Sequence, residues 1–339
     1  MTPAAILVSE QPTAYNLLHR NQPRSRQPPV HLLPKAIRRK LEARRLEKEK
    51  QQDMAASRNI DVSQLRTVCL ALGPYRNLTT LTASILFLHP HCQVLNHGGA
   101  RIFKDPALDF LLYPDRKTTD NFLRYAIQIS TKGKRGKTGG SIVHSHAFDE
   151  KHKLGRLYRE HFGDTLIKDE IHSLFWKESL RTSLHLRKHN VDLQKLFDAE
   201  PRLRFLLPVR NPLDCATSNL RTGHAKLFGL GKSPDITAVL DAILAEIRWF
   251  MELQDRHPGR FFHFLENDFG PEQARLLGEF LALDPHPAWV SVVQEAFDID
   301  RHYQHPGELV EHYRAAVDRH FAPWPHFREK LLAFTSPAA

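Results

Sequence analysis

From about Thr67 onward, short apolar runs alternate with longer segments of helical spacing, and this alternation constrains the fold more than any other feature. Most runs are too short for a helix and are bounded by glycine, proline or charged residues, which is typical of buried strands. Strands that alternate with helices predict an α/β fold of three layers (α/β/α), with a mostly parallel central sheet. We expect strands at 67–73, 92–95, 141–148, 172–177, 204–210 and 261–266. We expect helices at 79–88, 120–129, 150–162 and 235–253, a helix that follows the fourth strand and ends at 186, and a helix that begins at 212.

The first 60 residues differ from the rest, because several prolines interrupt the first half and a basic, charge-rich segment follows at 35–53. That segment has strong helix formers but few apolar residues, which predicts a solvated helix or a partly disordered arm. An arm that docks on an acidic partner or a membrane is the alternative. We therefore divide the chain into a basic N-terminal arm at 1–60 and a folded domain at 61–339, with a helical cap after about residue 285.

The formal net charge of the chain is +10, which favours an anionic partner such as a nucleotide, a nucleic acid, an acidic glycan or a membrane surface. Three widely spaced cysteines, Cys69, Cys92 and Cys215, form no disulfide framework and no zinc pattern. A reducing cytosol fits this cysteine usage. No apolar stretch is long enough to cross a bilayer, and the start of the chain lacks a signal-peptide pattern, so we expect a cytoplasmic protein.

The strand at 67–72 runs into the segment GPYRNLTT (73–80) and then into a helix. Such a joint offers backbone N–H groups and a helix N-terminus to an anion. Compared with the nucleoside triphosphate P-loop, Leu78 replaces the second glycine and Thr79 replaces the lysine, which argues against ATP or GTP hydrolysis. Arg76 supplies a guanidinium group earlier in the loop. The alternative is an ordinary strand-to-helix turn in which Asn77 or Thr79 caps the helix.

A second joint lies in RFLLPVRNPLDCATSNL (204–220), where a strand ends at Arg210 and a helix begins at Pro212. Ser218 follows two helical turns later. An arginine can bind a phosphate through two parallel hydrogen bonds, and a serine hydroxyl can add a third. A plain helix start, capped by Asn211 with Asp214 in its first turn, is the alternative, but it leaves the pairing of Arg210 with Ser218 unexplained.

Together the two joints resemble the donor-binding motifs of the sulfotransferases that use 3′-phosphoadenosine 5′-phosphosulfate (PAPS). The first resembles their loop of a basic residue followed by Ser-Gly-Thr-Thr, and the second resembles their Arg-Asp/Asn-Pro-x-Asp-x-x-x-Ser signature for the 3′-phosphate. The resemblance covers about residues 67–285, and Leu78 departs from it where the family has glycine. It implies that the donor contacts are Arg76, Asn77, Leu78, Thr79, Thr80, Arg210 and Ser218.

The resemblance also implies the residues of sulfuryl transfer. Lys177, at the end of the strand 172–177, resembles the lysine that polarises the bridging oxygen of the donor. His97 and His146 are the candidates for the general base, and Glu178 is a third. The cationic groups can handle the donor's charge, and the histidines around His146 lack a strong ligand spacing, so we expect no metal.

The loops after Leu72, Lys177 and Val209 should meet at one cleft, because ligands bind at the carboxyl ends of parallel strands. The acceptor is expected to carry a hydroxyl or an amine, and the basic segments 132–140 and 221–226 favour an anionic glycan, although solvated charge explains them more plainly. No nucleic-acid motif is present, so no nucleic-acid partner is expected. The alternatives are an inactive sulfotransferase-like binding module whose donor site Leu78 blocks, and a P-loop kinase or NTPase.

Overall fold

The computed structural model describes residues 34–133, 138–149, 152–297, 299 and 303–335. The chain divides into two units, 1–48 and 49–339, and the second holds the sheet and its covering helices. The first helix, α1 (Lys35–Ser57), belongs to both units, and its residues up to 45 are exposed. The part of the predicted arm before residue 34 lies outside the described residues. No helix in the described part of the chain is both long and apolar enough to span a membrane.

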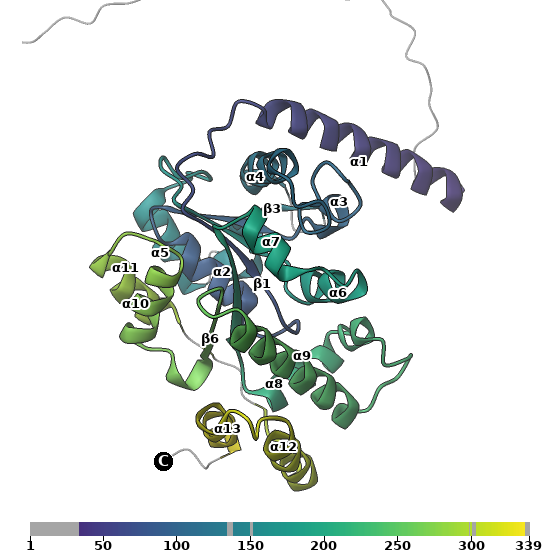
Figure 1. The fold of residues 1–339 in the computed structure, drawn as a ribbon, viewed down its shortest axis with the longest axis vertical. Coiled ribbons are helices and arrows are strands. Elements are labelled where there is room, and N and C mark those ends of the chain that lie inside the picture. Colours follow the sequence, from purple (N-terminus) through teal and green to yellow (C-terminus); the bar gives the residue numbers. More distant parts are fainter. Residues whose placement is uncertain (1–33, 134–137, 150–151, 298, 300–302, 336–339) are drawn as a thin grey trace, which may run out of the picture. The chain divides into compact units, whose positions relative to one another are not determined.

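A six-stranded sheet forms the centre of the second unit, in the order β3-β2-β4-β1-β5-β6 (Figure 1). Every neighbouring pair is parallel except β2 and β3, so the predicted α/β fold with a mostly parallel sheet is confirmed. The strands are β1 (Thr67–Ala71), β2 (Cys92–Asn96), β3 (Gly140–Ser141), β4 (Ser173–Lys177), β5 (Leu203–Val209) and β6 (Phe261–Leu265).

Two layers of helices cover the sheet. One layer contains α2 (Thr79–Phe87), α5 (Lys153–Phe162), α10 (Pro271–Phe280) and α11 (Pro287–Ala296). The other contains α3 (Gly99–Ile102), α4 (Arg116–Ser130), α6 (Leu180–Lys188), α7 (Leu193–Ala199), α8 (Pro212–Arg221), α9 (Ile236–Arg256), α12 (Gly307–His320) and α13 (Pro325–Leu332). With the sheet between them, these helix layers leave the two ends of the strands uncovered. The candidate site lies at the carboxyl ends of the strands.

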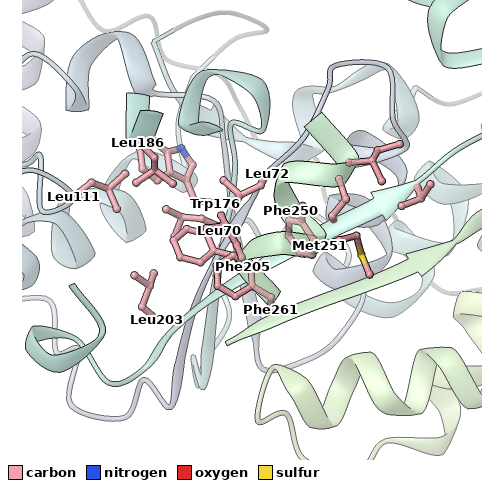
Figure 2. Packing of buried hydrophobic residues seen from close by; sticks show 14 of the residues in the cluster. Leu70, Leu72, Leu111, Trp176, Leu186, Leu203, Phe205, Phe250, Met251 and Phe261 are labelled. Atoms are coloured by element: carbon pink, nitrogen blue, oxygen red, sulfur yellow. The ribbon is translucent and has the colours of Figure 1, made fainter. Parts of the chain in front are cut away.

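Strand β1 shows why the short apolar runs are strands buried on both faces. Val68 and Leu70 pack into one apolar cluster, while Cys69 and Ala71 pack into the other, because successive side chains of a strand point to opposite faces. In the first cluster, Leu70 lies beside Trp176 of β4 and near Phe205 and Phe250 (Figure 2). All three cysteines are buried and form no disulfide.

The segment 141–148 differs from its prediction, because the strand ends at Ser141. Two short 3₁₀ helices follow, at Ile142–His144 and His146–Phe148. The Ser141 side chain accepts a hydrogen bond from the N–H of Val143 (3.3 Å), which turns the chain out of the sheet. The prediction of a strand is therefore wrong beyond Ser141, and His144 and His146 lie in the two 3₁₀ helices instead.

Candidate active site

A cavity of about 640 Å³ opens at the carboxyl ends of β1, β2, β4 and β5. The loops after Leu72 and Val209 contribute to its wall, as predicted, and at the end of β4 the wall is made by Lys177 itself and by Arg181 of α6. In the described part of the chain, its lining includes no aspartate or glutamate, and its cationic side chains are Arg76, Lys177, Arg181, Arg210 and Lys226. An excess of positive charge in one cavity favours an anionic ligand. The lining includes no residue of the C-terminal helices described beyond residue 285.

The loop between β1 and α2 has an unusual backbone. Gly73 has φ +88°, and a Cβ there would clash with Cδ1 of Leu207, so the turn requires glycine. Arg76 (φ 63°) and Leu78 (φ 59°) are also left-handed. Alternation of left-handed residues with others is typical of backbone nests that bind anions. Leu78 is the N-cap of α2 and has no side-chain acceptor, so the first N–H groups of this helix have no side-chain cap.

Asn77 connects this loop to the second joint. Its side chain is fully buried, its amide Nδ2 donates to the carbonyl oxygen of Pro208, and its Oδ1 accepts from the N–H of Arg210 (2.8 Å). These bonds commit the Asn77 side chain to the scaffold. Thr79 and Thr80, at the start of α2, line the cavity.

The two joints also touch through side chains. Nε of Arg76 donates to Oγ of Ser218 (3.0 Å), and Nδ2 of Asn219 donates to the carbonyl oxygen of Tyr75 (2.7 Å). These bonds join residues about 140 positions apart in the sequence, and they place the buried Ser218 behind Arg76 rather than in the described lining of the cavity. Asn219 was missed in the sequence, where its position next to Ser218 on the helix was the only signal.

Arg210 lies between two carboxylates. Its guanidinium group is 3.6 Å from Oδ2 of Asp214 and 3.9 Å from Oε2 of Glu266. Glu266 also accepts a hydrogen bond from the N–H of Asn211 (2.9 Å), and Nε2 of His305 lies 2.8 Å from Oδ1 of Asp214. The carboxylates orient the arginine at the cavity wall, and the role of Glu266 was not predicted.

Lys177 ends β4 and is 8% exposed. Its Nζ donates to Oδ1 of Asn96 at the end of β2 (3.3 Å). Burial, together with the nearby Arg76, lowers the pKa of Lys177 to about 8 despite the opposing effect of Glu178. The ammonium group is therefore still mostly protonated at neutral pH and contributes positive charge to the cavity.

His97 follows β2 beside Lys177 in the cavity wall. It has φ 62°, and its backbone is fixed because its N–H donates to the carbonyl oxygen of Lys177 (3.1 Å) while its own carbonyl accepts from Nε1 of Trp176 (2.8 Å). Burial and the charges of Lys177 and Arg181 lower the pKa of His97 to about 3. The imidazole is therefore neutral at pH 7 and able to accept a proton.

The other two candidate bases have different surroundings. His146 lines the cavity, but its side chain is 80% exposed, and its Nδ1 lies 3.4 Å from Oδ2 of Asp149. Glu178 is fully buried, accepts a hydrogen bond from the N–H of Gly99 (2.9 Å) and does not belong to the described lining. Burial raises the pKa of Glu178. Only the two histidines of the three candidates face the cavity.

Segment 221–226 flanks the cavity as expected, and Thr222, Gly223, His224 and Lys226 line it. The ring of His224 lies 5.4 Å from that of Tyr75. In the other basic segment, residues 134–137 lie outside the described residues. Arg181, which lines the cavity from the first turn of α6, was missed, although its place shortly after the end of β4 was a usable signal.

Comparisons with known proteins found no matching family model and no matching curated protein. Among solved structures, the chain is similar to a mouse sulfotransferase, SULT7A1, complexed with PAP (10% identity, 84% of this chain, 93% of the other, TM-score 0.39). It is also similar to a sulfotransferase from Alicyclobacillus acidocaldarius (15%, 78%, 95%, TM-score 0.38). A third is sulfotransferase STF9 from Mycobacterium avium (15%, 87%, 87%, TM-score 0.40). TM-scores of this size carry no argument about function, which has to rest on the site.

Proposed function

We propose that this protein is a sulfotransferase that transfers a sulfuryl group from PAPS to a hydroxyl or amine of an acceptor. The observation that carries the proposal is the hydrogen bond from Nε of Arg76 to Oγ of Ser218. It joins the two motifs, which the resemblance assigns to the two ends of one nucleotide, at a single cationic cavity. An ordinary strand-to-helix turn needs neither this bond nor the excess of positive charge.

We assign the residues of the cavity and its wall to the two anionic ends of the donor, the 3′-phosphate and the 5′-phosphosulfate. A hydroxyl that accepts from Arg76 still has its own O–H to donate, so Ser218 can bind a phosphate oxygen. Arg210, held by Asp214 and Glu266, supplies the guanidinium group for the same 3′-phosphate. Arg76 and the uncapped N–H groups at the start of α2 then serve the 5′-phosphosulfate.

In the proposed reaction, the acceptor oxygen or nitrogen attacks the sulfur of PAPS, and the bond from sulfur to the bridging oxygen breaks. The base takes the acceptor's proton, and the released electron pair stays on the leaving PAP. The protonated Lys177 stabilises the negative charge that develops on the bridging oxygen. Because Lys177 and Arg76 supply positive charge, we expect the transfer to proceed without a metal ion.

We assign the base to His97 rather than to His146. His97 is neutral, fixed through its backbone and placed beside Lys177 in the lining, whereas the His146 side chain is mostly exposed. A base with a pKa of about 3 is weak; burial is the largest cause of the low value, and a bound anionic donor opposes only the smaller effect of Lys177 and Arg181. The same cationic lining favours an anionic acceptor such as an acidic glycan, and a cytoplasmic location remains our expectation.

Titration calorimetry with PAP, the desulfated product, tests the donor site without knowledge of the acceptor. We expect saturable binding by the wild type and a loss of about 1–3 kcal/mol, roughly 5- to 150-fold in affinity, for Arg210→Ala. Arg210→Lys is the matched control, because it keeps the charge but loses the paired hydrogen bonds. Thermal melting of each variant separates lost binding from lost folding.

The binding-module alternative has its own supporting observation, because the Leu78 side chain lines the cavity at a left-handed position. Wild-type protein that melts normally but does not bind PAP would favour that module and overturn the sulfotransferase proposal. A parallel titration with ATP and Mg²⁺ covers the kinase or NTPase alternative. We expect no specific binding there, since Thr79 stands where the P-loop lysine would be.

A further inference from the structure

Three metal-ligating side chains meet at the amino edge of the sheet, away from the cavity. His91 directly precedes β2, His172 directly precedes β4, and Asp284 follows α10. Since Cys92 pairs with Ser173 in the parallel register, the two histidines are neighbours across the strands. The N–H of His172 donates to the carbonyl oxygen of His91 (3.0 Å), and their rings lie 4.4 Å apart. The sheet itself therefore brings the two imidazoles together.

The candidate metal-ligand atoms of these three residues lie close together. Oδ2 of Asp284 lies 2.9 Å from Nδ1 of His172 and 3.3 Å from Nδ1 of His91, and the candidate ligand atoms all lie within 4.8 Å of one another. A tetrahedral ion with bonds of about 2.0–2.1 Å holds its ligand atoms roughly 3.3 Å apart. Both Nδ1 atoms are buried, and each contacts Oδ2 of Asp284. The spacing suits a small divalent ion.

The surrounding groups also suit metal ligation. A histidine that binds a metal through one ring nitrogen usually directs the other toward a carboxylate. Oε2 of Glu170 lies 3.8 Å from Nε2 of His91 and 3.7 Å from Nε2 of His172. Nη1 of Arg66 donates to the other carboxylate oxygen of Asp284, Oδ1 (2.7 Å). This bond holds the carboxylate with Oδ2 beside the two histidines.

We propose that His91, His172 and Asp284 bind one divalent transition-metal ion through Nδ1, Nδ1 and Oδ2. Two imidazoles and one carboxylate favour ions of the Zn²⁺ and Co²⁺ class over Mg²⁺ or Ca²⁺, which prefer oxygen ligands alone. The site is distinct from the proposed donor cavity, because the five residues of β2, roughly 17 Å at about 3.3 Å per residue, separate His91 from His97. We assign the ion a structural role that ties two strand starts to the segment after α10.

The test uses the full chain, stripped with a chelator and titrated with Co²⁺, whose visible absorption reports low-coordinate ligation by nitrogen and oxygen. We expect one ion per chain, displaced by Zn²⁺. Affinity should fall about tenfold or more in His91→Gln, His172→Gln and Asp284→Asn. His326→Gln is the matched control, because this exposed histidine on α13 lies outside the cluster and should leave the spectrum unchanged.

Two further measurements keep the inference falsifiable. Zn²⁺ should raise the melting temperature of the wild type in a concentration-dependent way, and this rise should disappear in Asp284→Asn even if that variant is less stable at the outset. The cavity variant His97→Gln should bind Co²⁺ as the wild type does. Equal binding by the wild type and a His91→Gln/His172→Gln double variant overturns the site, as does loss of binding in His97→Gln. Neither result depends on PAP binding, so the two proposals fail separately.

Discussion

The two strand-to-helix joints of the candidate site differ in how the first backbone N–H groups of the helix are hydrogen-bonded. At the β5–α8 joint, Asn211 accepts from the N–H of Leu213 (3.0 Å), and Pro212 occupies the first turn of the helix. At the β1–α2 joint, the N-cap is Leu78, which offers no acceptor. The start of α8 is capped by a side chain of its own sequence, whereas the start of α2 leaves backbone N–H groups available to a ligand.

The two asparagines sharpen this contrast. Asn211 bonds within its own helix start, while Asn77 reaches across to Pro208 and Arg210 on the neighbouring joint. The β1–α2 loop is therefore held by a partner strand rather than by a local cap. A loop anchored in this way can keep a strained backbone and uncapped N–H groups, because the cost is met by the packed sheet.

The largest expected effect is that of Asn77→Ala. Removing this side chain leaves the Pro208 carbonyl and the Arg210 N–H without partners in a buried position. We expect a loss of about 3 kcal/mol in the free energy of unfolding, measured by urea denaturation, from about 1–3 kcal/mol for each unpaired group. Asn211→Ala is the matched control and should cost about 1 kcal/mol, as a lost cap does. Equal losses in the two variants would contradict the contrast between the joints.

A third strand end, that of β4, carries Lys177, which should make the affinity for PAP depend on pH. Burial and the nearby Arg76 lower the pKa of Lys177 to about 8. The protonated form attracts the anionic ligand and is lost as pH rises through that value, so PAP affinity should be fully present below it and fall above it. We expect roughly a tenfold loss between about pH 7.5 and 9.5 by calorimetry.

Lys177→Gln is the control for this dependence. It should bind PAP more weakly at neutral pH and show a flat response over the same alkaline range, because no ammonium group titrates there. A wild type and a variant with the same alkaline slope would assign the loss to another group.

The smallest expected effect concerns the left-handed backbone of Leu78. A residue with a Cβ pays roughly 1–2 kcal/mol in this conformation, whereas glycine adopts it freely. We expect Leu78→Gly to be about 1 kcal/mol more stable than Leu78→Ala, a comparison that removes the leucine side chain from both variants. PAP affinity should be kept in both. If Leu78→Ala proves as stable as Leu78→Gly in urea denaturation, the loop does not impose the left-handed backbone on this residue.

Apart from the segment 141–148, the strands were predicted from their short apolar runs to within two residues at each end, as in β1, β4 and β5. Such runs are buried on both faces, so their composition alone carries the signal. The prediction failed at 141–148, where a serine that bonds to a nearby backbone N–H ended the strand after Ser141. A side chain that replaces the hydrogen bonds between strands by a local bond does not change the hydrophobic pattern, so the sequence does not reveal it.

The contacts of the candidate site were also only partly visible in the sequence. Arg76, Lys177 and Arg210 could be selected because they follow strands whose carboxyl ends share one edge. Asn96 and Glu266 could not, because their relevance depends on which strands become neighbours.

By itself, the sequence determined the alternation of strands and helices, the burial of both faces of the sheet and the positive charge gathered at the strand ends, because periodicity and composition act locally. The tertiary structure alone decided that Arg76 meets Ser218, that Asn77 serves the scaffold, and that His91 lies against His172. These contacts join residues far apart in the chain. They exist only once the strand order and register are set by packing many side chains together, and no local pattern records that outcome.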